Sequence, residues 1–259
     1  MPMFGLGCTQ PGEEDDTRNA VIAALENGYR LIDTASVYEN EADVGHGLRA
    51  AAIPRNDVFL ATKVWNSDLG YDRTLAAFDR SLQLLQVEYI DLYMIHFPLI
   101  RLRRESWRAL GKLYEDGRCR AIGVSNFAIR HIEEIVDETG VLPAVNQVEF
   151  NPFLNQRRLH EWCRRKEILV QTHTPVSKQT RRRERRLSEL AGPYGKSPAQ
   201  LLLRWALQKG VGVLVRSLDP QEIADQADIF DFEISLRDVD AMDSLHENLR
   251  VGWDPSSAP

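Results

Sequence analysis

Residues 58–63, Val-Phe-Leu-Ala-Thr-Lys, and residues 90–95, Ile-Asp-Leu-Tyr-Met-Ile, are two short apolar runs on either side of a helical pattern. The helical pattern spans 72–85 and repeats apolar side chains on one face, at Leu75, Phe78, Leu82 and Leu85. Strands that are apolar along most of their length are typical of a parallel sheet covered on both faces. Because parallel neighbours need a crossover connection, this stretch predicts a β-α-β unit.

The same alternation continues along almost the whole chain. Strands are predicted at 3–7, 30–34, 58–63, 90–95, 120–124, 144–149, 168–173 and 211–216, and the clearest helices at 17–26, 72–85, 108–115 and 197–208. Eight strands, each followed by a helix or helical turn, predict a closed (β/α)8 TIM barrel of the α/β class. A barrel of this kind needs about 250 residues, so we expect a single domain over residues 1–259.

An open, doubly wound sheet is the competing fold. It would carry a G-x-G-x-x-G fingerprint directly after the first strand. The segment Gly5-Leu-Gly7 has Gln10 at the third glycine position, and Gly45-His-Gly47 lies inside a helical pattern. The sequence therefore favours the barrel.

Composition narrows the class of protein. A formal net charge of −6 argues against nucleic acid or an anionic membrane as a partner. The cysteines Cys8, Cys119 and Cys163 are widely spaced and form no CxxC, which predicts reduced thiols, a cytoplasmic location and no zinc site. The arginine-rich run at 181–186 is interpreted as a solvent-exposed face of a loop or helix. The alternative is a positively charged edge of the cofactor site, near a cofactor phosphate.

Chemical groups follow several of the predicted strands. Asp33 ends the second strand with Tyr38 five residues later, Lys63 ends the third, and His96 follows the fourth. In a barrel these strand ends meet at one mouth. Later strand ends contribute a further polar set, which is Ser125, Asn126, Gln147, His173, Arg216 and Ser217.

Asp33, Tyr38, Lys63 and His96 together make a coherent acid catalyst. A free phenol has a pKa near ~10, which is high for a proton donor at neutral pH, and we expect the Lys63 ammonium to lower it. Asp33 would keep Lys63 charged, and His96 could donate a hydrogen bond to a carbonyl oxygen. No H-x-H or HExxH occurs, so no metal is expected.

Several longer segments carry a family resemblance. They are Gly28-Tyr-Arg-Leu-Ile-Asp-Thr-Ala-Ser-Val-Tyr38, Ala61-Thr-Lys63, Asp91-Leu-Tyr-Met-Ile-His96-Phe-Pro98, Ala121-Ile-Gly-Val-Ser-Asn-Phe127, Val145-Asn-Gln-Val-Glu-Phe-Asn-Pro152 and Lys196-Ser-Pro-Ala-Gln200. In this order they resemble the aldo-keto reductases, in the branch of 2,5-diketogluconate reductase and the prostaglandin F synthase-like enzymes. The resemblance covers nearly the whole chain.

The resemblance implies a barrel that binds extended NADPH and reduces a small-molecule carbonyl, with no obligate protein partner evident; the family is commonly monomeric. It implies that Asp33, Tyr38, Lys63 and His96 form the catalytic tetrad. Ser125, Asn126 and Gln147 would hold the nicotinamide carboxamide, Arg216 and Ser217 would hold the adenosine 2′-phosphate, and Trp65 would line the substrate pocket.

The chain departs from the family pattern in four places. The first strand begins almost at residue 1, so the usual N-terminal hairpin is not expected. His173 replaces the aromatic residue that stacks on the nicotinamide, in the segment His173-Thr-Pro-Val176, and a histidine can titrate. Glu222 replaces an arginine that clamps the adenosine phosphate, so NADH is also a candidate cofactor. The loop after His96, over 97–106, is short, which predicts a shallow substrate pocket.

Two other functions remain open from the sequence. One is a cofactor-binding barrel that senses or scaffolds with little turnover, because fold alone does not fix function. The other is metal-dependent hydrolysis, for which the sequence offers no ligand set.

Overall fold

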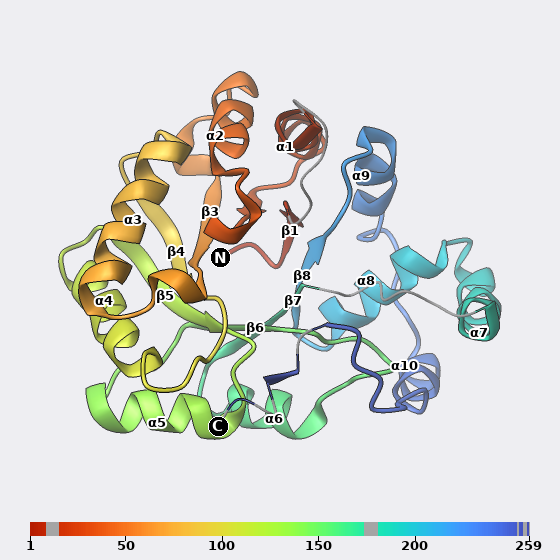
Figure 1. Ribbon diagram of the computed structural model, residues 1–259. Helices are drawn as coiled ribbons and strands as arrows, with labels where there is room; N and C mark the ends of the chain where they lie inside the picture. Colours follow the sequence, from red (N-terminus) through yellow and green to blue (C-terminus); the bar gives the residue numbers. More distant parts are fainter. Residues whose placement is uncertain (9–15, 174–180, 253, 256–257, 259) are drawn as a thin grey trace.

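A computed structural model describes residues 1–8, 16–173, 181–252, 254–255 and 258, with backbone alone for 181–183. Eight parallel strands close into a barrel in the order in which they occur in the chain, and β1 pairs with β8 through Phe4 and Val213 (Figure 1). The strands are β1 Phe4–Gly7, β2 Leu31–Asp33, β3 Phe59–Val64, β4 Ile90–Ile95, β5 Cys119–Ser125, β6 Val145–Val148, β7 Leu169–Thr172 and β8 Gly212–Val215. The predicted barrel is therefore confirmed, with each strand end within two residues of its predicted position.

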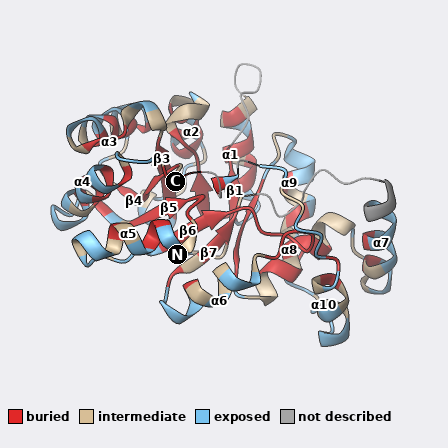
Figure 2. Cartoon of the chain, turned by 60° about the horizontal axis from the view of Figure 1, so that its bottom comes forward, coloured by how far each residue is buried: buried red, intermediate tan, exposed pale blue. Residues whose placement is uncertain are grey.

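Helices surround the barrel and turn their buried faces toward the strands (Figure 2). They are α1 Asp16–Glu26, α2 Glu41–Ala50, α3 Tyr71–Leu85, α4 Arg103–Glu115, α5 Ile129–Thr139, α6 Arg157–Arg165, α7 Arg181–Ala191, α8 Pro198–Gln208, α9 Pro220–Ala227 and α10 Leu236–Asp243. Within the described ranges, no helix is both long enough and apolar enough to cross a membrane.

The helix predicted at 108–115 in fact begins at Arg103. Arg103 is 3% exposed, donates to the Pro98 carbonyl at 3.0 Å and pairs with Glu134 of α5. The polar residues of the first turn therefore pack against α5, and an apolar period could not show this. The loop after His96 is accordingly shorter than predicted and ends at Leu102.

The second glycine pair lies in α2, as predicted, and serves helix packing. A Cβ added at Gly45 would lie 2.4 Å from the Leu85 carbonyl oxygen of α3. At Gly47 it would lie 2.7 Å from the Cβ of Val21 in α1. These glycines allow three helices to approach closely, which is a structural use of the residue and not a phosphate-binding one.

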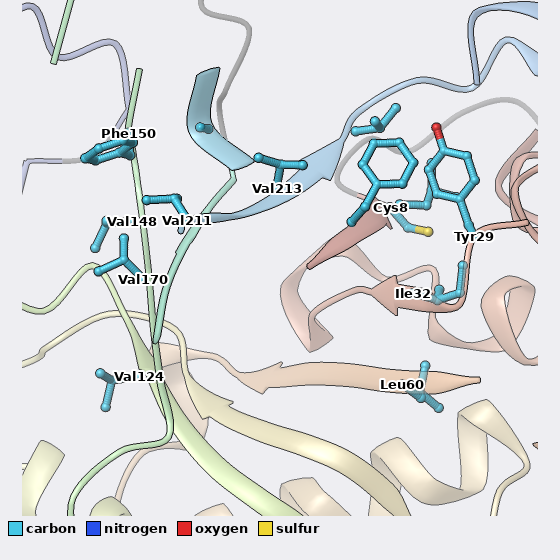
Figure 3. Packing of buried hydrophobic residues seen from close by; sticks show 14 of the residues in the cluster. Cys8, Tyr29, Ile32, Leu60, Val124, Val148, Phe150, Val170, Val211 and Val213 are labelled. Carbon is cyan, nitrogen blue, oxygen red and sulfur yellow. The ribbon is translucent and has the colours of Figure 1, made fainter. Parts of the chain in front are cut away.

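The main hydrophobic core lies between the strands and the helices. Tyr29, Ile32, Leu60, Val124 and Val213 are among its buried side chains (Figure 3). Inside the barrel a smaller apolar cluster holds Ala61, Leu92, Met94 and Val145. The inner cluster stops short of the C-terminal mouth, where polar groups follow it along the strands.

Candidate active site

A buried ion pair lies at the mouth of the barrel. The Lys63 Nζ donates to Asp33 Oδ1 at 2.5 Å and to the Thr34 carbonyl at 2.9 Å. Both residues are 0% exposed, at the ends of neighbouring strands β3 and β2. Burying either charge alone would be costly, so the pairing is required for both to be ionised.

A pinned turn brings Tyr38 to this pair. After β2, the short 3-10 helix Ser36–Tyr38 folds over the mouth, and Ser36 donates its hydroxyl to the Lys63 carbonyl at 3.1 Å. Asn40 fixes the far side of the turn, because it donates to the Cys8 carbonyl at 2.9 Å and accepts from Thr34 at 2.6 Å. The Lys63 amine lies 5.7 Å from the centre of the Tyr38 ring.

His96 completes the group, directly after β4. Its Nε2 lies 3.3 Å from the Tyr38 hydroxyl oxygen. Its ring meets those of Tyr38 and Trp65 edge-on, with centroid separations of 5.5 Å and 5.1 Å. The structure thus brings Asp33, Tyr38, Lys63 and His96 together, with Trp65 against the same imidazole.

The pKa of Tyr38 moves in the direction opposite to our expectation. Burial raises it above 10.0, and the Asp33 carboxylate raises it further. Lys63 does not lower it because its amine is bonded to Asp33, so the phenol faces a neutral pair and not a bare cation. The phenol is consequently protonated throughout the neutral range.

Both histidines at the mouth are neutral. Burial lowers the pKa of His96 well below 6.5, and Lys63 and His173 lower it further. Burial, followed by Arg216 and Lys63, lowers the pKa of His173 to about 3. The His173 ring is therefore uncharged near neutral pH. The rest of its segment, residues 174–176, lies outside the described residues.

Three polar side chains cluster between the ends of β5 and β6. Ser125 donates to the Gln147 carbonyl at 2.9 Å, and Asn126 donates to the His96 carbonyl at 3.0 Å. Asn126 takes the left-handed conformation, with φ of 62°, and its Oδ1 lies 3.4 Å from His173 Nε2. The predicted nicotinamide-binding residues therefore form one continuous group beside His96.

Gln171 on β7 joins this network and was missed by the sequence reasoning. Gln147 Nε2 donates to Asp33 Oδ2 at 2.9 Å and to Gln171 Oε1 at 2.8 Å. Gln171 is 0% exposed, and its own Nε2 has no hydrogen-bond partner among the described residues. A buried glutamine inside a strand was the available signal, since such a group needs a partner.

The end of β8 is different in character. Arg216 is exposed, and Ser217 donates its hydroxyl to Glu222 Oε2 at 2.7 Å. Gln226 holds the other oxygen of Glu222 at 2.8 Å. Glu222 therefore faces the hydroxyl that was predicted to hold a phosphate.

The arginine-rich run begins α7. Of its described side chains, Arg185 is exposed and pairs with Glu189 one turn later at 3.0 Å. This supports the solvated face for that part of the run. In the part of the chain that the structure describes, no three His, Cys, Asp or Glu side chains gather as a metal site.

A closed barrel with a buried Lys–Asp pair, a protonated phenol and a neutral imidazole at its mouth defines a class, the barrel enzymes that work by acid–base chemistry.

Comparisons with known proteins give the family. The model of the aldo/keto reductase family matches residues 3–247. The chain is 44% identical to a glyoxal reductase of Bacillus subtilis over 98% of this chain and 92% of that protein. It is 42% identical to a 9,11-endoperoxide prostaglandin H2 reductase of Trypanosoma cruzi over 99% and 92%. The crystal structure of a Bombyx mori aldo-keto reductase in complex with NADP superposes with a TM-score of 0.91, at 34% identity over 97% and 91%.

The chain therefore belongs to the aldo/keto reductase family, and it is an NAD(P)H-dependent oxidoreductase.

Proposed function

We propose that this protein reduces small aldehydes or ketones to alcohols with NADPH, and that Tyr38 is the proton donor. The observation that carries the proposal is the 3.3 Å separation between the Tyr38 hydroxyl and His96 Nε2. Two hydrogen-bond donors this close can both reach one carbonyl oxygen. Negative charge grows on that oxygen when hydride reaches the carbon, so donors aimed there stabilise the transition state.

The polar set beside His96 fits a nicotinamide carboxamide. A carboxamide needs both donors and acceptors, and Ser125, Asn126 and Gln147 carry a hydroxyl and two amides. To donate to it, Asn126 would exchange its contact with the His96 carbonyl, and Gln147 its contact with Gln171. When bound, NADPH supplies the hydride. His173 would present its ring to the nicotinamide. The nicotinamide becomes positively charged when it loses its hydride, and a neutral imidazole does not repel that charge.

The protonation state of Tyr38 suits reduction. Tyr38 holds its proton because burial and Asp33 raise its pKa, so the donor is loaded at neutral pH. A developing alkoxide is a stronger base than a phenolate, and it takes that proton without a prior fall in the pKa of Tyr38.

The phosphate end supports use of NADH beside NADPH. Arg216 can form charge-assisted contacts with a 2′-phosphate. Glu222 weakens phosphate binding, because its carboxylate repels a phosphate and already accepts the hydrogen bond of the Ser217 hydroxyl. A carboxylate at this position suits a ribose 2′-hydroxyl, which can donate to it.

The test uses Tyr38→Phe. Wild type should oxidise NADPH in the presence of glyoxal, a substrate class suggested by the name of the Bacillus relative. Tyr38→Phe should lose turnover by at least about a hundredfold, because general acid catalysis contributes ~10²–10⁴. Cofactor affinity, measured by quenching of tryptophan fluorescence, should stay within about twofold of wild type.

Unchanged turnover in Tyr38→Phe would reject Tyr38 as the donor. Tight NADPH binding without turnover of any small aldehyde by wild type would instead favour the sensing or scaffolding barrel.

A further inference from the structure

A second cavity lies beside the catalytic mouth. It has a volume of about 900 Å³, and its lining comes from the first turns of α5 and α6 and from residues 243–250 at and after the end of α10. Figure 1 labels these helices. None of Tyr38, Lys63 and His96 is among the described residues that line it. Its size is within the usual range for small-molecule sites, roughly 300–1,000 Å³.

The charges around this cavity are mostly positive. Arg130, Arg157, Arg158 and Arg250 line it, against two carboxylates, Glu133 and Asp243. Asp243 is already bonded to Lys209 at 2.6 Å and to the Trp205 indole at 2.9 Å. Arg250 is likewise partnered, with Gln156 at 3.3 Å and Asp254 at 3.5 Å.

Arg157 and Arg158 have no such partners. Across the described ranges, neither makes a hydrogen bond or an ion pair. They are the first two residues of α6, and Arg130 is the second residue of α5. Neither first turn contains an acidic residue. Arg130 donates to the Ala258 carbonyl at 2.6 Å, whereas Arg157 and Arg158 are exposed cations at the positive end of the α6 dipole. An anion in the cavity would offset the charge of these two arginines.

The floor of the cavity is apolar. Phe127, Val148 and Leu154 are buried there, and Ile129 and Leu159 are half-buried. A bare inorganic ion would contact the arginines but would leave the apolar lining exposed to water. An organic anion would use both features, because its body covers the apolar floor while its charged end meets Arg157 and Arg158.

We propose that this cavity, lined by Arg130, Arg157 and Arg158 over an apolar floor, is a second binding site that takes a small organic anion with an apolar body. The site is separate from the tetrad but touches it through one residue. Asn126 lines the cavity, holds the His96 carbonyl at 3.0 Å and lies 3.4 Å from His173. Occupancy can thus alter how the nicotinamide end is held.

The experiment uses a matched pair of fluorescent probes. 8-Anilinonaphthalene-1-sulfonate carries an anion on an apolar body, and N-phenyl-1-naphthylamine has the same body without the anion. Each is titrated into wild type saturated with NADPH, so that the cofactor site is filled. The sulfonate should bind saturably and at least about tenfold more tightly than the neutral probe, since only the sulfonate can form a charge-assisted contact with the arginines.

Two double variants locate the site. Arg157→Ala/Arg158→Ala should weaken the sulfonate by about tenfold or more and leave the neutral probe unchanged. Arg164→Ala/Arg165→Ala removes the same charge from the other end of α6, where both side chains are exposed, and should leave both probes unchanged. The melting temperature of Arg157→Ala/Arg158→Ala should not fall, because the substitution removes repulsion at a helix start.

Equal sulfonate affinity in wild type and Arg157→Ala/Arg158→Ala would overturn the proposal. So would an equal loss in both double variants, which would indicate only a general effect of charge. Saturable sulfonate binding that is seen only in protein without NADPH would place the probe in the cofactor site and would also overturn it. The probes report on this cavity whether or not Tyr38 is the proton donor.

Discussion

The two ends of the proposed cofactor site are built in different ways. At the chemical end, Asp33 and Lys63 are 0% exposed, and Asp33 accepts from Lys63 of the adjacent β3 and from Gln147 of β6 across the barrel. At the phosphate end, Arg216 is exposed and Ser217 is bonded to Glu222, a residue of the surface helix α9. The first end is part of the barrel core, whereas the second is a surface feature added to it.

This difference shows where change is tolerated. A substitution at the chemical end disturbs both catalysis and folding, since buried charges depend on each other. A substitution at the phosphate end alters cofactor selectivity with little effect on the fold. The departure from the family pattern at Glu222 falls at the tolerant end.

The largest expected effect is on the free energy of unfolding, when a cation is replaced by methionine at each end of the proposed cofactor site. Lys63→Met should lower the free energy of unfolding by about 3–5 kcal/mol, because it leaves Asp33 buried without its partner. Arg216→Met should change it by less than about 0.5 kcal/mol, since the side chain is exposed. Urea unfolding of both variants measures the contrast.

Asp33→Leu/Lys63→Met provides the control. Removing both charges should recover much of the lost stability without recovering turnover. If Lys63→Met alone were as stable as wild type, the ion pair would not be the reason for the difference between the ends.

The next effect concerns selectivity. Glu222→Arg should raise the ratio of NADPH to NADH efficiency by about tenfold, which corresponds to ~1.4 kcal/mol of altered phosphate binding. Asp225→Arg makes the same charge change on α9, but Asp225 accepts from Gln221 and not from Ser217, so it should shift the ratio far less. Equal shifts in both variants would mean that overall charge, and not the contact with Ser217, sets selectivity.

A smaller effect tests the network beneath the tetrad. Gln171→Met should lower kcat about fivefold, because Gln147 loses an acceptor and holds Asp33 less firmly, at a cost of ~1 kcal/mol. Its stability should change little, since one unsatisfied N–H replaces another. Thr172→Val removes the neighbouring hydroxyl, which is bonded to Phe150, and should lower stability while leaving kcat unchanged. The opposite pattern would make Gln171 purely structural.

The smallest expected effect is a flat pH profile. The pKa of His96 is lowered from 6.5 and that of Tyr38 is raised from 10.0, so neither should titrate between these values. Below that range protonation of His96 would remove activity, and above it loss of the Tyr38 proton would do so. Measured kcat/KM for glyoxal reduction should be constant from pH 6.5 to 10, and a titration near pH 7 would contradict the assignment of a neutral His96.

Local pattern predicted much of the fold and of the candidate site. Most strands are short and mainly apolar, so their positions could be found without knowing their neighbours. The rule that barrel strand ends meet at one mouth was then enough to place Asp33, Lys63 and His96 together. The start of α4 was missed because Arg103 is a charged residue that packs inward against Glu134.

The sequence by itself determined the barrel and the identity of the groups at the mouth, because apolar periodicity and strand-end chemistry are local properties, and its longer motifs carried the family resemblance. Only the tertiary structure decided how those groups behave. Burial, followed by the Asp33 carboxylate, raised the pKa of the Tyr38 phenol, and the contact with Gln171 holds Gln147 against Asp33. These outcomes depend on distances and burial between strands far apart in the chain, which no local pattern contains.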